Sequence, residues 1–137
     1  MKFRNVYSGL IIAIMAALFC LSALAADESA SGEINGKCGA TPQQPSIPNG
    51  LQASKDEMLA ALDKIHTYQA ESKKYRGCID GLMSTWAQQT DPKDKDAVTA
   101  TNAKKDIAIT FYNKSVDDEK EVADLFNSAI RAFKGKK

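Results

Sequence analysis

Three cysteines and a single histidine are the side chains of this 137-residue chain best suited to nucleophilic, redox or metal chemistry. A Ser-His-Asp or Cys-His catalytic set would have to use that one histidine, His66. Its neighbours on a helix would be Asp63 and Ala70, so no second strong metal ligand follows one turn later. We therefore predict that the chain is not an enzyme and has no cofactor and no metal site. A small enzyme built around His66 remains as an alternative.

The first 25 residues have the three-part layout of a secretory signal peptide. Lys2 and Arg4 give a positive start, an apolar run follows over residues 10–21, and a small-residue cleavage site ends at Ala25. The run is shorter than the roughly 20 apolar residues that a membrane helix needs. We predict export to the periplasm or secretion, and no stable membrane insertion after cleavage. An uncleaved N-terminal anchor is the alternative.

The two remaining cysteines, Cys38 and Cys78, carry the clearest chemical prediction. Cys20 belongs to the apolar run of the signal peptide. Thiols oxidise outside the cytoplasm, so an even pair in an exported chain indicates one disulfide. Two free thiols are the alternative. A zinc site is disfavoured, because two sulfurs and one distant histidine make a poor ligand set.

The charge of the mature chain is close to balanced. The whole sequence has 18 basic and 17 acidic residues. Lys2 and Arg4 are removed with the signal peptide and no acidic residue goes with them, which leaves 16 basic against 17 acidic side chains. Because nucleic-acid binding calls for a basic face, we predict no nucleic-acid partner.

Composition divides the mature chain into three segments. Residues 26–37 are small, polar and acidic without apolar periodicity, which predicts disorder. Residues 38–53 contain three prolines spaced by three positions (Pro42, Pro45 and Pro48), which favours an extended polyproline-type arm. We expect this arm to pack against the rest of the chain. Its two P-x-x-P patterns leave recognition by a peptide-binding domain as the alternative. Residues 54–134 follow as the helical domain.

Two long amphipathic helices are predicted in the helical domain, over about 55–89 and 95–134. Ser54 and Glu57 form an S-x-x-E capping box at the first start, and Asp91-Pro92 marks the chain reversal. Apolar and small residues recur at near-heptad spacing in both helices. In the first the stripe is Met58, Ala61, Ile65, Tyr68, Ser72, Tyr75, Ile79, Leu82 and Trp86, and in the second Ala97, Thr101, Ala108, Phe111, Ser115, Val122, Leu125 or Phe126, Ala129 and Phe133. The predicted fold is all-α: an antiparallel two-helix hairpin of coiled-coil type.

The disulfide would tie the arm back along this hairpin. The arm turns at Asn49-Gly50, and about 50 Å of polyproline-type chain is long enough to reach Cys78, roughly 36 Å into the first helix. Ile47 and Leu51 would then pack on the seam between the helices. Gly77 and Gly81 would let the arm approach the helix backbone, although a kink near Gly81 is the alternative.

The layout resembles a loose group of small exported bacterial helical proteins without an assigned activity. The shared residues are Cys38, Pro45, Pro48, Gly50, Met58, Tyr75 and Cys78, spread over about 40 residues. The resemblance implies export, a helical hairpin and a Cys38–Cys78 bridge, but no activity. Gly77 directly before Cys78 and the short linker at Pro92 depart from the pattern.

Together these features favour a non-enzymatic binding or structural protein of the cell envelope. A helical hairpin exposes extended faces that can add helices from a partner protein or from a second copy. Trp86, near the expected tip of the hairpin, is the candidate for an exposed partner contact. The alternative function is a periplasmic chaperone or stress protein, which would use exposed apolar surface.

Overall fold

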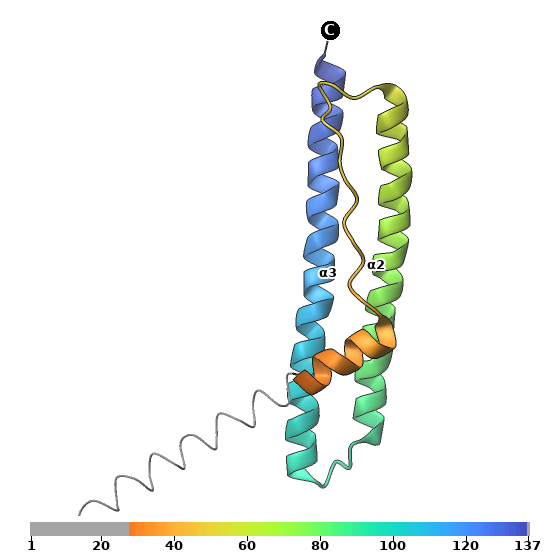
Figure 1. Ribbon diagram of the computed structural model, residues 1–137. Coiled ribbons are helices and arrows are strands. Elements are labelled where there is room, and N and C mark those ends of the chain that lie inside the picture. The colour runs from red at the N-terminus through yellow and green to blue at the C-terminus, as the bar shows by residue number, and fades with distance from the viewer. Residues whose placement is uncertain (1–27, 137) are drawn as a thin grey trace, which may run out of the picture.

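The computed structural model describes residues 28–136, and within this range it contains helices and connecting segments but no strand. Helix α2 runs over Lys55–Gln89 and helix α3 over Lys95–Gly135. The two lie side by side and run in opposite directions, joined at one end by residues 90–94 (Figure 1). The all-α prediction is confirmed, and the helix bounds agree with the expected ones to within one residue. The predicted signal peptide lies outside the described residues.

Local capping chemistry fixes where the two long helices begin. Ser54 Oγ accepts a hydrogen bond from the Glu57 N–H at 3.2 Å, and Glu57 Oε2 accepts one from the Ser54 N–H at 2.7 Å. The predicted capping box is therefore confirmed. Asp94 begins α3 in a related way, because its Oδ1 accepts from the backbone N–H groups of Asp96 and Ala97 at 3.0 Å each.

The seam between α2 and α3 contains two apolar clusters. They are separated by a short polar section, which we call the polar waist and which is centred on Ser72 and Ser115. The distal cluster, far from the 90–94 loop, contains Ala53, Met58, Ala61, Ile65, Tyr68, Val122, Phe126 and Ala129. The loop-end cluster contains Ile34, Tyr75, Ile79, Trp86 and Ala108. Ser72 and Ser115 are fully buried between them. Eight of the nine stripe positions expected in α2 are buried, so the near-heptad spacing identified the core face correctly.

Residues 28–38 form a helix, and the prediction of disorder over residues 26–37 is therefore wrong where the structure describes the chain. Ala30 and Ile34 are fully buried, and Ile34 belongs to the loop-end cluster. We call residues 28–38 the cover helix. It lies across α2 and α3 rather than parallel to them (Figure 1). Tertiary contacts account for its order, because its sequence is too polar to form a stable helix alone.

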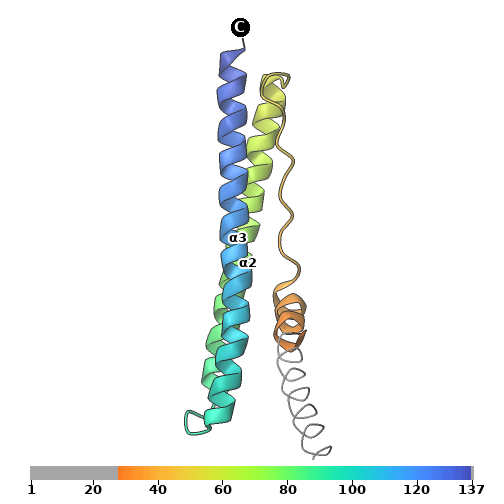
Figure 2. The same cartoon turned by 90° about the vertical axis from the view of Figure 1, so that its left-hand side faces the viewer.

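The arm, residues 39–53, leads from the cover helix to the start of α2 without regular structure. It runs along the same side of the helix pair as the cover helix, as the second view makes plain (Figure 2). Ile47 packs against the distal cluster as expected. Leu51 is 63% exposed, so its expected packing on the seam is wrong, and the buried residues of this stretch are Gly50 and Ala53.

A glycine does permit a close backbone approach, but not one of those expected. A Cβ on Gly50 would lie 1.9 Å from the carbonyl oxygen of Ala129 in α3, so the turn packs directly on that helix. A Cβ on Gly77 or Gly81 would meet nothing within 4 Å. The role expected for those two glycines is therefore wrong, and α2 is continuous through both.

Candidate functional site

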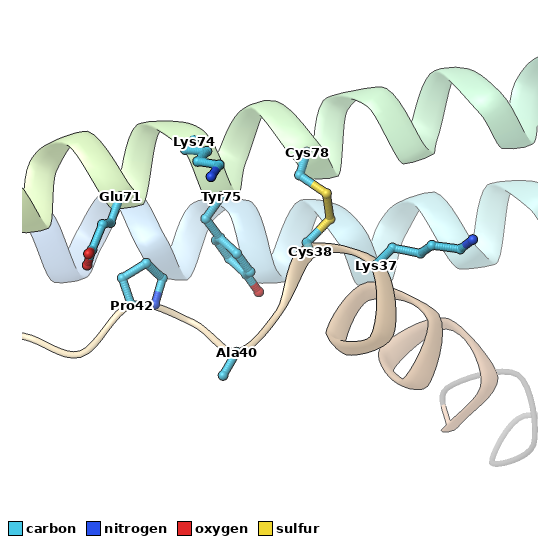
Figure 3. A pocket seen from close by; sticks show the side chains of 8 residues that line it. All are labelled: Lys37, Cys38, Ala40, Pro42, Glu71, Lys74, Tyr75 and Cys78. Carbon is cyan, nitrogen blue, oxygen red and sulfur yellow. A yellow bond between two sulfur atoms is a disulfide. The ribbon is translucent and has the colours of Figure 1, made fainter.

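The predicted disulfide is confirmed, and it joins Cys38 to Cys78 with their Cα atoms 5.6 Å apart. Cys38 is the last residue of the cover helix rather than the first of the arm, and Cys78 lies within α2 (Figure 3). The bridge therefore fastens the cover helix and the start of the arm to the middle of the helix pair. Both cysteines are half-buried.

A pocket of about 340 Å³ opens beside this bridge. It lies between the arm and α2, and the side chains that line it are Lys37, Cys38, Ala40, Pro42, Glu71, Lys74, Tyr75 and Cys78 (Figure 3). The Thr41 hydroxyl donates a hydrogen bond to the Tyr75 hydroxyl oxygen at 3.4 Å, which holds the arm over the pocket. The sequence predicted the two cysteines as a pair, but not that they line an accessible hollow.

Trp86 does not form the exposed partner contact that the sequence suggested. Its side chain is 5% exposed, and its Nε1–H donates a hydrogen bond to Glu33 Oε1 of the cover helix at 2.9 Å. Lys104 Nζ lies 5.4 Å from the indole ring centroid and 3.3 Å from Glu33 Oε2. The cover helix thus occupies the surface that a partner would need.

Glu33 is the residue of this contact that the sequence did not point to. The Trp86 indole N–H lowers the pKa of its carboxyl, and Lys104 lowers it further, against an opposing effect of partial burial. The charged carboxylate is therefore the form that fits the docked cover helix. One signal in the sequence could have found this contact, since Ala30 and Ile34 are small or apolar residues spaced by four in a polar segment.

The side of the helix pair away from the arm has an ion pair at its centre. Arg76 Nη2 lies 2.7 Å from Glu119 Oε2, and the Arg76 guanidinium also donates a hydrogen bond to Ser115 Oγ at 3.2 Å. The guanidinium carbon is 6.0 Å from the ring centroid of Tyr112. These contacts connect α2 and α3 at the level of the polar waist.

Exposed apolar side chains flank this ion pair on α3. Lys114 and Asp118 face the arm, because they line a hollow with residues 41–44. Val116 is two positions from each, about 200° around the helix, and therefore points away from the arm. Ile109 lies two turns earlier on the same side. Ile109 is 45% exposed and Val116 42% exposed. We call Arg76, Ile109, Tyr112, Val116 and Glu119 the open face.

The other candidate residues do not assemble into a site. His66 is exposed on α2. Within residues 28–136 no group of three or more histidine, cysteine, aspartate or glutamate side chains is arranged to hold a metal ion. None of the helices in that range has the length and apolar composition needed to cross a bilayer.

No protein-family model, curated protein or solved structure matches this chain.

Proposed function

We propose that this chain is an exported, non-enzymatic binding or structural protein of the cell envelope. Its scaffold is the antiparallel hairpin of α2 and α3, braced on one side by the arm and the disulfide. Its contact surface is the open face on the other side. The partner is another protein, which adds a helix to the pair.

Export is supported by two independent features. The first 25 residues follow the layout of a secretory signal, although they lie outside the described part of the chain. The Cys38–Cys78 disulfide belongs to an oxidising compartment, because thiols stay reduced in the cytoplasm. The periplasm or the cell exterior would both maintain the bridge.

The observation that carries the proposal is the one-sided covering of the helix pair. The cover helix and the arm both lie on the same side of α2 and α3 (Figure 2). The opposite side presents Ile109 and Val116, each more than two-fifths exposed, around a fixed arginine. Apolar and aromatic side chains together with an arginine, here Ile109, Val116, Tyr112 and Arg76, are the residue types found at the centre of protein contacts.

The charges around the open face suggest the chemistry of the partner helix. Lys105 lies one turn before Ile109, and Lys120 lies one turn after Val116. A partner helix with an apolar stripe and flanking carboxylates would match both the apolar and the basic groups. Helix addition of this kind is read through residues spaced by three and four.

Site-specific photo-crosslinking in exporting cells tests the proposal. A photoreactive amino acid at position 109 or 116 should give a discrete protein adduct, and the same group at position 51 should not. Leu51 is a matched control because it is the more exposed side chain and lies in the turn of the arm. The absence of any adduct specific to positions 109 and 116 would refute a contact role for the open face.

The same exposed residues also favour a chaperone as the second candidate function. Ile109 and Val116 would then contact many unfolded clients weakly instead of one partner. Aggregation assays with several unfolded client proteins separate the two. Suppression that is lost in an Ile109→Asp, Val116→Asp double variant supports the chaperone, whereas one discrete crosslinked adduct without suppression supports the binding protein.

A further inference from the structure

We propose that the Cys38–Cys78 bridge is a reversible thiol–disulfide exchange site, and that its reduction by a dithiol releases the cover helix from Trp86. This inference does not depend on the open face. It concerns the opposite side of the molecule, and it would hold whatever the open face binds.

The bridge is placed where an external thiol can reach it. Cys38 and Cys78 both line the pocket between the arm and α2, and both are half-buried rather than enclosed (Figure 3). Accessibility of the sulfur atoms is the first requirement for exchange, because the attacking thiolate must approach along the S–S axis.

The contacts that hold α2 to α3 are independent of the bridge. The distal cluster draws its buried residues from Ala53, α2 and α3, and Arg76 joins Glu119 on the side away from the arm. The cover helix, in contrast, supplies Ile34 to the loop-end cluster and Glu33 to the hydrogen bond with Trp86. Reduction should therefore free a local unit and leave the helix pair folded.

The cover helix should not stay docked once its tether is cut. With the predicted cleavage after Ala25, at most 13 residues precede the arm. Isolated helices shorter than about 12 to 15 residues are marginal in water. Glu33 and Lys104 are each about one-third exposed, so water can replace their contact. The disulfide keeps the effective concentration of this weak helix high at its docking surface.

Local charge favours exchange at this bridge. Lys74 lies one turn before Cys78, Lys37 directly precedes Cys38, and both lysines line the pocket. A thiolate on either cysteine would therefore have a cation close by. An incoming thiolate can attack either sulfur, and the other sulfur then leaves as the thiolate.

The reaction balances with a dithiol as the reductant. Its first thiolate bonds to one sulfur of the bridge, the S–S bond breaks, and the other cysteine leaves as a thiolate that takes a proton. The second thiol of the dithiol then attacks the mixed disulfide, and the first cysteine leaves in turn. Two electrons and two protons pass to the bridge, and the dithiol becomes a disulfide.

Trp86 reports this release directly, because it is the single tryptophan of the chain and its indole contacts Glu33. The test uses the mature chain under native conditions, with dithiothreitol as the dithiol. We expect reduction to shift Trp86 emission to longer wavelength and to increase its quenching by acrylamide, while the circular dichroism of α2 and α3 persists. Reoxidation should restore the original emission.

Two variants distinguish release of the cover helix from a general loosening of the fold. Cys38→Ser combined with Cys78→Ser should show the exposed Trp86 signal without reductant and keep the long helices. Ile34→Ala, with the bridge intact, should keep Trp86 covered until dithiothreitol is added. Glutathione added to the folded, oxidised chain, with the reaction stopped by acid, should give a mixed disulfide at one bridge cysteine, which peptide mass spectrometry detects.

Three results would overturn the inference. The first is a bridge that dithiothreitol reduces only after the chain is unfolded. The second is Trp86 emission that does not change when the bridge is fully reduced. The third is loss of the α2 and α3 circular dichroism on reduction or in the double serine variant, which would make the bridge a support of the whole fold.

Discussion

Arg76 of α2 and Glu119 of α3 form an ion pair at 2.7 Å that crosses the polar waist between two apolar clusters. Their side chains are 16% and 25% exposed, so the pair is only partly desolvated. An apolar seam alone would tolerate sliding of one helix along the other by a heptad. Because Arg76 and Glu119 can pair in only one register of the two helices, sliding by a heptad would break the pair. Polar residues in coiled-coil seams fix the register in the same way.

Removing one member of this pair should destabilise the chain. Arg76→Met keeps most of the side-chain volume but leaves Glu119 and Ser115 without their donor, and we expect a loss of about 1 to 3 kcal/mol in the free energy of unfolding. Urea unfolding followed by circular dichroism measures it. Lys114→Met is the control, since the Lys114 side chain is 65% exposed and pairs with Asp118 one turn away in the same helix, so its loss should matter much less. Equal effects in the two variants would contradict a special role for the waist.

The two buried serines of the waist should respond in opposite ways to alanine. Ser115 Oγ accepts from Arg76, so Ser115→Ala should cost about 1 kcal/mol. Ser72 Oγ is buried without a hydrogen bond of normal geometry, so Ser72→Ala should be neutral or stabilising. Thermal unfolding of both variants checks this difference. A loss in Ser72→Ala as large as that in Ser115→Ala would show that Ser72 has a firm partner.

The Tyr68 phenol, one turn before Ser72, offers a second measurement. Burial raises its pKa, the Ser72 hydroxyl opposes that rise, and the nearby Asp118 and Glu119 carboxylates add to it. Spectroscopic titration of Tyr68 in the Ser72→Ala variant should therefore give a pKa further above the ordinary value than in the parent chain. An unchanged titration would argue against contact between the two hydroxyls.

Gly50 should be far less tolerant of substitution than Gly81. A Cβ at position 50 collides with the Ala129 carbonyl, so Gly50→Ala must lift the turn from α3, and we expect a loss of about 1 to 3 kcal/mol. Gly81→Ala places its methyl group in open space and should gain up to about 1 kcal/mol from helix propensity. Denaturant unfolding of the two variants gives the comparison. Stabilisation in both would mean that the turn does not pack on α3.

Docking of the cover helix should weaken in acid. The folded-state pKa of Glu33 is below the ordinary value of 4.5, so its contribution is fully present above that value and is lost as the pH falls through the lowered pKa. The charged groups that face Glu33 are Lys104 and Lys37. Trp86 emission, followed from about pH 6 to about pH 3, should report the loss. Glu33→Gln should flatten this profile, and an unaltered profile in that variant would assign the transition to other carboxyl groups.

Much of the fold could be predicted because its signals are local. The spacing of Met58, Ile65, Tyr68, Tyr75 and Ile79 identifies one face of a helix whatever that helix packs against. Ser54 and Glu57 lie three residues apart and close their capping box within one turn. In the same way, the two cysteines that follow the predicted signal peptide indicated the bridge, because they allow only one pairing.

The candidate sites could be predicted less well, because they depend on which surfaces of α2 and α3 the cover helix and the arm lie against. Trp86 was expected to be exposed because it lies near the hairpin tip, yet the cover helix reaches it from more than 50 positions earlier in the chain. Val116 and Ile109 were not singled out, since their exposure depends on which side of the pair the arm takes. No periodicity within α3 contains that information.

The sequence by itself therefore determined the two long helices, their buried stripe, their caps and the cysteine pair, since each depends on residues a few positions apart or on composition. Only the tertiary structure decided that residues 28–38 are helical, that Gly50 rather than Gly77 meets a backbone, and that one face of the pair stays open. Those outcomes depend on contacts between segments that are distant in the sequence. The cover helix, for example, is ordered because the disulfide holds it against the surface of α2 and α3 on which it docks.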